Sequence, residues 1–284
     1  MQQYIDLVDN ALKKYMETED NPGIYEAMSY SLFAGGKRLR PVIMIMTAKM
    51  LGAQPETVLP FACAMEMIHT YSLIHDDLPA MDNDDLRRGK PTNHKVFGEA
   101  KAILAGDALL TKAFEIAAGY DVQGVCKKSV LRAISVLAKA AGADGMVAGQ
   151  MIDIESHDED LELLRHLHSL KTGAIIRAAG VIGAILSGAD EESVKAVDDF
   201  CLNLGIAFQI QDDILDVMGS EQELGKPIGS DAENHKSTYV TICGIEGAKK
   251  LAQEYTDRAV KCLSRFKNNS ELITMAENLM SRKA

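Results

Sequence analysis

Aspartates gather in two short segments of this chain. The first runs Asp76-Asp77-Leu78-Pro79-Ala80-Met81-Asp82 and the second Asp212-Asp213-Ile214-Leu215-Asp216. Carboxylates this close together repel one another by roughly 1 kcal/mol per pair at 4 Å in water and about 4 kcal/mol near a protein surface. Cations relieve that repulsion, and oxygen ligands suit Mg²⁺, with Mn²⁺ as the alternative. Because Mg²⁺ fills much of its shell with water and phosphate oxygens, the clusters predict a phosphorylated or diphosphorylated substrate.

Two basic segments could hold the phosphate groups that such a metal site implies. The run Gly35-Gly36-Lys37-Arg38-Leu39-Arg40-Pro41 lies at the start of an expected helix, and arginine offers paired donors to phosphate. A short basic run is by itself more typical of an exposed surface. Arg87 and Arg88 carry more information, because they directly follow the acidic segment and could face the metal across a bound phosphate.

Other polar residues lie in apolar or loop surroundings. His69 stands nearly two helical turns before the first cluster, where a second anion could bind, whereas His75 is interpreted as a packing or positioning histidine. Lys171, which is followed by Thr172, has apolar neighbours, and a buried ammonium is costly unless it meets a charge. Gln209 also has apolar neighbours one turn before the second cluster, and a buried polar side chain there needs a partner as well. The charged loop before residue 237 adds two lysines that could close over a phosphate or stay solvated, Lys226 and Lys236.

Helical spacing of apolar residues, scarce proline and abundant alanine predict an all-α chain that forms a single domain over residues 1–284. Pro79 disturbs the helix that carries the first cluster, so Asp82 is expected from a bent segment. Residues 83–96 are expected to be irregular. The predicted helices are Gln3–Thr18, one from Ile24 to the Gly35-Gly36 pair, Val42–Leu51, Val58–Leu78, Ala100–Ala118, Lys127–Ala141, Gly145–Glu155, Leu161–Ser187, Glu191–Met218, and one from Tyr239 to the end.

Composition excludes several classes of protein. A net charge of -11 argues against nucleic acid as a partner. The longest apolar stretch, Ala178–Ala189, is too short to span a membrane, and the first residues lack the pattern of a signal peptide, so a cytoplasmic location is expected. Five dispersed cysteines without a C-x-x-C pattern indicate neither a disulfide framework nor a zinc site. No signature of a nucleotide-binding loop or of a nucleophile elbow is present.

Together these residues resemble the trans-type isoprenyl diphosphate synthases, most closely the bacterial farnesyl diphosphate synthases, over nearly the whole chain. The resemblance implies a homodimeric helical bundle of the isoprenoid-synthase type around a large central cavity, with about three Mg²⁺ ions holding an allylic diphosphate. The implied metal ligands are Asp76, Asp77, Asp82, Asp212, Asp213 and Asp216. The implied contacts to the allylic diphosphate are Arg87, Lys171, Thr172, Gln209, Lys226 and Lys236. The implied contacts to isopentenyl diphosphate are Gly36, Lys37, Arg40, His69 and Arg88, with Arg38 nearby.

The resemblance also implies a reaction. Dimethylallyl or geranyl diphosphate ionises, isopentenyl diphosphate attacks the allylic cation, and loss of a proton completes the elongation. Thr172 and Gln209 would steady the cation, while Gln150 and Asp153 would lie near the reaction centre. An aromatic residue five positions before Asp76, with Ser72 beside it, looks like a floor for the growing chain, so Tyr71 predicts a C15 product. Residues 81–94 are also similar to plant geranylgeranyl enzymes, which leaves C20 open, and C10 remains a further alternative.

Three other functions compete with this interpretation. A class I terpene cyclase would share the fold and the metal cluster, but it would not need the Lys37, Arg40, His69 and Arg88 pocket. A phosphohydrolase that used His75 and Asp76 would leave the second aspartate cluster unexplained. A helical partner subunit without activity of its own would be expected to lose aspartates from one cluster, whereas this chain keeps both.

Overall fold

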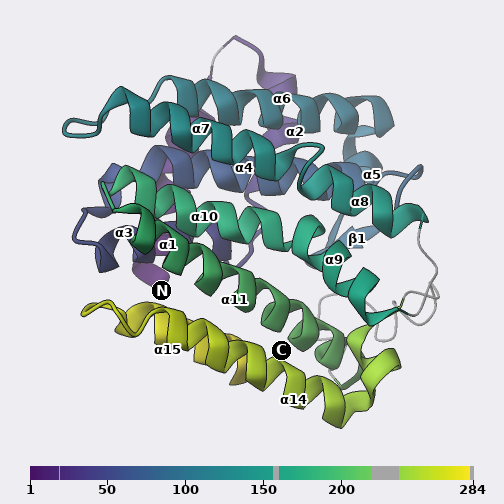
Figure 1. Cartoon of the computed structure of the whole chain (residues 1–284). Coiled ribbons are helices and arrows are strands. Elements are labelled where there is room, and N and C mark those ends of the chain that lie inside the picture. The colour runs from purple at the N-terminus through teal and green to yellow at the C-terminus, as the bar shows by residue number, and fades with distance from the viewer. Residues whose placement is uncertain (19, 156–159, 219–236, 282–284) are drawn as a thin grey trace.

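The computed structural model describes residues 1–18, 20–155, 160–218 and 237–281, which fold almost entirely into helices (Figure 1). The predicted all-α class is confirmed, while the single-domain organisation stays a prediction. The helices are α1 (Gln2–Tyr15), α2 (Pro22–Leu32), α3 (Leu39–Met50), η1 (Pro55–Thr57), α4 (Leu59–Asp76), α5 (Asn93–Phe97), α6 (Glu99–Ala118), α7 (Lys127–Ala141), α8 (Met146–Glu155), α9 (Leu161–Lys171), α10 (Gly173–Leu186), α11 (Glu191–Met218), α14 (Tyr239–Cys262) and α15 (Ser270–Ser281).

The helices stack in layers, with α6 and α7 at the top of Figure 1, α4 and α10 in the middle, α11 below them, and α14 and α15 at the bottom. The central helix is α10, which packs against α3, α7 and α11. Small residues make this close packing feasible. A Cβ on Gly183 would lie 2.7 Å from the backbone oxygen of Met44 on α3, and a Cβ on Gly180 would overlap the Cys201 side chain on α11. The apolar face of α10 is therefore buried on several sides, which suits its almost wholly apolar sequence.

A bend interrupts the helix that the sequence predicts over Leu161–Ser187. The chain forms two helices instead, α9 and α10, which meet at 47° with Thr172 between them. The start of α10 approaches α11 closely, since a Cβ on Gly205 would lie 3.4 Å from the Gly173 Cα atom. In the described part of the chain, no single helix is long and apolar enough to cross a membrane, and only this bent pair taken together meets that test.

The predicted continuous helix from Tyr239 to the end is also wrong. Gly244 has φ 70° and ψ 164°, which kinks α14 inside its second turn. The helix then ends at Cys262, and the Asn269 side chain donates a hydrogen bond of 2.9 Å to the Leu263 carbonyl before α15 begins. A positive φ is compatible with glycine and incompatible with regular helix, so the helix breaks at this residue although the apolar spacing continues through it.

The stretch expected to be irregular contains a small hairpin and a short helix. Strands β1 (Leu86–Arg87) and β2 (Lys90–Pro91) pair antiparallel, with Arg87 opposite Lys90. The two residues that join them, Arg88 and Gly89, have φ values of 54° and 72°. A two-residue turn with both φ values positive matches the twist of a hairpin, and glycine favours it. The hairpin presents Arg87 and Arg88 next to the end of α4.

Candidate active site

One cavity of about 720 Å³ collects most of the residues that the sequence predicts for a site. It lies among α3, α4, the hairpin, α8, the α9–α10 bend and α11. The predicted residues that line it are Arg40, His69, Tyr71, Ser72, Asp76, Asp82, Arg87, Arg88, Lys171, Thr172, Gln209 and Asp212. The predicted residues that do not line it are Gly36, Lys37, Asp77, Asp213 and Asp216. Two predicted residues lie outside the described residues, Lys226 and Lys236.

The first aspartate segment is divided between the cavity and the interior. Asp76 ends α4, and its backbone carbonyl accepts a hydrogen bond of 2.9 Å from the Asp82 N–H, so the turn after the helix returns Asp82 to the cavity. Asp77 is buried, and its Oδ1 accepts a hydrogen bond of 2.6 Å from Arg87 Nε. Burial raises the pKa of Asp76 to about 6; the Lys171 charge opposes this shift and the Asp82 charge adds to it.

The second segment is divided in the same way. Asp212 lines the cavity, whereas Asp213 and Asp216 are buried. Asp213 Oδ2 accepts a hydrogen bond of 2.7 Å from the backbone N–H of Tyr239, the first residue of α14. A capping box between Thr238 and a threonine three residues later fixes this helix start. A carboxylate at the positive end of a helix is stabilised there, so Asp213 joins α11 to α14.

The carboxylates that share the cavity are Asp76 at the end of α4, Asp82 in the turn after it and Asp212 inside α11. Among the residues that the structure describes, no three His, Cys, Asp or Glu side chains converge closely enough to hold an ion by themselves. These oxygen donors fit Mg²⁺ on the condition that water or substrate oxygens complete its shell, which is how Mg²⁺ is usually bound. The donor set therefore fits the predicted metal without a preformed protein cage.

Two arginines and a histidine line another part of the cavity wall. Arg40 comes from the first turn of α3, His69 from α4 and Arg88 from the hairpin turn. Arg40 Nε is buried without a hydrogen-bond partner, and Arg88 donates to the neutral carbonyl of Gly35. Burial lowers the pKa of His69 well below its usual range, and the Arg40 and Arg88 charges lower it further, so the imidazole is neutral. Guanidinium groups that bond to no carboxylate in the described part of the chain suit an anion such as a phosphate, so this part of the wall is a candidate anion site.

The loop before α3 shapes this anion site. Gly36 has φ 126°, and the Arg88 guanidinium lies where a Cβ on Gly36 would be, at 2.6 to 2.8 Å. Arg38 is buried with φ 46° and does not line the cavity. Its guanidinium donates hydrogen bonds of 2.8 Å to Asp9 and to Glu66, and one of 2.7 Å to the Leu32 carbonyl. Gly36 thus makes room for Arg88, and Arg38 anchors the loop.

The bend between α9 and α10 brings Lys171 and Thr172 into the cavity wall. Lys171 Nζ donates a hydrogen bond of 2.6 Å to Asp153 on α8. A Cβ on Gly149 of α8 would overlap the Lys171 backbone, so the two helices touch at this point. Gln150, one residue further along α8, lines the cavity as well. Positions implied for Gln150 and Asp153 by the family resemblance are therefore next to the cavity and to Lys171.

Sequence reasoning missed the apolar part of the lining. Val147, Met151 and Ile154 on α8 line the cavity with about half of each side chain exposed, at 50%, 55% and 52%. Phe208 on α11 lines it too, and so does His75 on α4, which the sequence marks as a packing or positioning histidine. The three α8 residues are spaced by four and three positions, which places them on one helix face, so the sequence does contain a pattern that could have indicated this apolar wall. A large apolar wall suits a hydrocarbon ligand.

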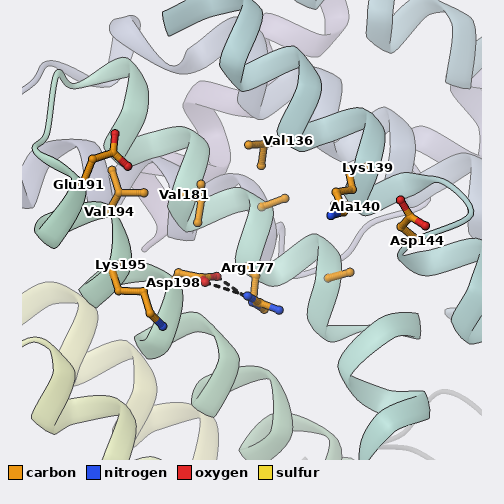
Figure 2. A pocket seen from close by; sticks show the side chains of 12 residues that line it. Val136, Lys139, Ala140, Asp144, Arg177, Val181, Glu191, Val194, Lys195 and Asp198 are labelled. Carbon is orange, nitrogen blue, oxygen red and sulfur yellow. Dashed lines mark hydrogen bonds and ion pairs between the residues drawn. The ribbon is translucent and has the colours of Figure 1, made fainter.

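A second hollow, of about 400 Å³, lies between α7, α10 and α11 (Figure 2) and contains none of the predicted site residues. Its central cation is already neutralised, because Arg177 donates hydrogen bonds of 2.7 and 2.8 Å to the two carboxylate oxygens of Asp198. Arg40 and Arg88 bond to no carboxylate in the described part of the chain. The larger cavity is therefore the one with unsatisfied charge.

Carboxylates, arginines and an apolar wall share one cavity of this helical bundle, an arrangement that suits an enzyme whose substrates combine a diphosphate with a hydrocarbon. Comparison with known proteins makes this specific. A family model described as polyprenyl synthetase matches residues 21–279. The chain belongs to the polyprenyl synthetase family and is a prenyltransferase.

Relatives with different products resemble the chain to a similar degree. The farnesyl diphosphate synthase of Geobacillus stearothermophilus is 53% identical over 249 residues, which cover 86% of this chain and 84% of that protein. Large subunit 1 of a heterodimeric chloroplastic geranylgeranyl pyrophosphate synthase of Arabidopsis thaliana is 48% identical over 89% of this chain and 70% of its own. The apo crystal structure of an FPP/GFPP synthase from Zymomonas mobilis covers 98% of this chain and 97% of its own, with a TM-score of 0.88 and 37% identity.

Proposed function

We propose that this prenyltransferase condenses isopentenyl diphosphate with dimethylallyl or geranyl diphosphate in a Mg²⁺-dependent reaction, with farnesyl diphosphate as its main product. One observation carries the proposal: Asp76, Asp82 and Asp212 line the same cavity as Arg40, His69 and Arg88. A site with carboxylates for metal-bound diphosphate and separate cations for a second diphosphate accepts two charged substrates at once.

The proposed reaction breaks the C1–O bond of the allylic diphosphate, and the bonding electron pair leaves with the diphosphate. The double bond of isopentenyl diphosphate then forms a C–C bond to the allylic cation, and a proton is lost to the released pyrophosphate. Arg87 and Lys171 would stabilise the leaving charge, since both line the cavity beside Asp76. Thr172 and Gln209 would direct dipoles at the cation, and the apolar wall on α8 would exclude water from it.

Mg²⁺, when bound, would neutralise the departing diphosphate. The protein would place carboxylates at the cavity and keep them deprotonated. Burial raises the pKa of Asp76, and the Lys171 charge counteracts that rise. Asp77 remains a proposed ligand, and its bond to Arg87 gives it a second role in fixing the hairpin. Asp213 and Asp216 are buried beside Asp212 and complete the proposed second cluster.

The C15 product rests on Tyr71. Its ring lines the cavity from α4, more than one helical turn before Asp76, and only 7% of the residue is exposed. A bulky side chain there would stop a chain that grows away from the diphosphate. Ser72 lines the same wall and leaves more room. Relatives named as farnesyl and as geranylgeranyl synthases are both close, so the C20 product is the main competing outcome.

Purified protein incubated with Mg²⁺, isopentenyl diphosphate and either allylic primer tests the proposal, with chain lengths determined after dephosphorylation. Farnesol as the main alcohol supports it, and geranylgeraniol would keep the condensation but refute the C15 assignment. Absence of condensation, with a cyclic hydrocarbon formed from geranyl or farnesyl diphosphate instead, would favour a terpene cyclase. No reaction under any of these conditions would favour a partner subunit.

We also propose that the chain works as a homodimer in the cytoplasm. Large apolar side chains are exposed on the neighbouring helices α6 and α7: Ile103 at 44%, Leu104 at 58% and Leu131 at 68%. A second copy that covered this face would remove the apolar area from water. Light scattering coupled to gel filtration tests the dimer, and Leu104→Glu should convert it to monomer. Cell fractionation tests the location.

A further inference from the structure

The His75 side chain occupies a defined place between the cavity and α6. It lines the cavity one turn beyond Tyr71 on α4, and the two rings meet edge to face with centroids 5.7 Å apart at 75°. Its Nε2 lies 3.1 Å from the backbone carbonyl of Ile103 on α6. The imidazole therefore packs against the proposed floor residue on one side and is hydrogen-bonded to the neighbouring helix on the other.

A glycine on α6 makes room for this ring. A Cβ added to Gly106 would overlap Nε2, Cδ2 and Cε1 of His75, closer than real Cβ atoms approach other atoms. The overlapped group is a ring held by a hydrogen bond to Ile103, not the free end of a flexible chain. Asp107, the next residue of α6, lies 3.9 Å from the same nitrogen. Gly106 thus forms a notch in α6 into which the imidazole fits.

We propose that His75, seated in the Gly106 notch, is a determinant of product length because it supports the Tyr71 ring and forms part of the cavity wall. The inference rests on the proposed chain-elongating function and deepens it. His75 is a positioning and specificity residue and not a catalytic one. It would meet the hydrocarbon tail of the product, while its polar nitrogen is directed at α6.

Two substitutions should move the product in opposite directions. His75→Ala removes the edge-to-face partner of Tyr71 and empties the notch, so the ring can swing toward α6 and the cavity deepens. Gly106→Ala fills the notch, and the imidazole must move toward the cavity, which becomes shallower. Because the prenyl chain grows by five carbons at each condensation, a change in cavity depth should change the product length by one such unit. We therefore expect a shift from C15 toward C20 for His75→Ala and from C15 toward C10 for Gly106→Ala.

The double variant distinguishes this mechanism from a general loss of packing. If Gly106→Ala acts by displacing His75, its added methyl meets empty space once the imidazole is gone. The double variant should then give the longer product of His75→Ala, not an average of the two single variants. Tyr71→Ala serves as the reference for an opened floor. Circular dichroism and thermal melting confirm that each variant is folded before its products are compared.

The experiment measures the ratio of C10, C15 and C20 alcohols from dimethylallyl diphosphate and isopentenyl diphosphate for the unmodified protein and all four variants. Opposite shifts in the single variants, with the double variant following His75→Ala, support the proposal. A folded His75→Ala and a folded Gly106→Ala that both keep the unmodified product ratio would overturn it while leaving the proposed function intact. An unmodified protein that forms no prenyl product would refute the proposed function, and this inference with it.

Discussion

Gly36→Ala is the sharpest perturbation of the proposed isopentenyl diphosphate site. The substitution adds one methyl group at a position where the Arg88 guanidinium lies 2.6 to 2.8 Å from the new carbon. Arg88 must move, and the hydrogen bond that it donates to the Gly35 carbonyl must break or lengthen. The added carbon meets neither Asp76 nor Asp212, so the proposed site for the allylic diphosphate should keep its geometry.

The size of the effect follows from what Arg88 would donate. A hydrogen bond between an ionised donor and a charged acceptor contributes about 1.5 to 3 kcal/mol. Loss of one such bond to a diphosphate lowers kcat/KM by about 10- to 150-fold, since 1.36 kcal/mol corresponds to tenfold. Steady-state kinetics with saturating allylic diphosphate and varied isopentenyl diphosphate should place most of this loss in KM. With varied allylic diphosphate, KM should change by less than about threefold, because the loss falls on the other substrate.

Gly35→Ala is the matched control. Gly35 also has a positive φ, 101°, but a Cβ there would meet nothing within 4 Å. Both variants therefore carry a backbone strain of roughly 1 to 3 kcal/mol, and only Gly36→Ala displaces Arg88. Thermal melting should show a similar loss of stability in the two. Equal KM values for isopentenyl diphosphate in both variants would refute the assignment of Arg88 to that substrate.

Three further predictions concern charge. Arg38→Met should destabilise the fold by about 3 to 5 kcal/mol in urea unfolding, because it leaves buried Glu66 without its cation, and Arg38→Met with Glu66→Leu should recover most of that loss. Burial lowers the pKa of His168 from 6.5 to about 4, so the unfolded chain takes up a proton at this residue at a higher pH than the folded chain does. The free energy of unfolding should therefore fall as pH drops from 6.5 to 4. His168→Gln should remove up to about 3 kcal/mol of that fall, and an unchanged pH profile of stability contradicts the prediction. Removal of metal with EDTA should abolish turnover and Mg²⁺ should restore it, while Asp76→Ala or Asp212→Ala should lower turnover on the order of 10²-fold or more with an unchanged melting temperature; near-normal activity in either variant contradicts the metal assignment.

Apolar periodicity predicted the helices well where one face of a regular helix is buried. The helices over Lys127–Ala141 and Glu191–Met218 have the predicted bounds. Periodicity failed at Thr172, because a bend of 47° between two apolar helices leaves the apolar spacing on both sides intact. It also failed at Gly244, where a single positive φ kinks the chain. Breaks of this kind depend on neighbouring elements that a single segment of sequence does not reveal.

The site could be predicted as far as charge and spacing go. Charged groups crowded into apolar surroundings are costly without partners, and that cost marked the aspartates and Lys171 in the sequence, while Arg88 was marked by its position directly after the acidic segment. The apolar wall on α8 was not predicted, because the spacing of Val147, Met151 and Ile154 is that of any apolar helix face and only the fold places a cavity beside them. Arg38 could not be separated from its basic neighbours for a related reason: only the fold places Glu66 and Asp9 around its guanidinium.

Helix geometry explains why each aspartate pair is divided. Adjacent residues on a helix point about 100° apart, so two neighbouring carboxylates do not easily face one cavity. Asp76 and Asp212 line the cavity, and the second member of each pair is bonded elsewhere: Asp77 to Arg87 and Asp213 to the start of α14. The paired aspartates therefore combine two tasks at adjacent positions. In each pair, one carboxylate lines the cavity in which the proposed cation would bind, and the next bonds to the hairpin or to the helix that borders the same cavity.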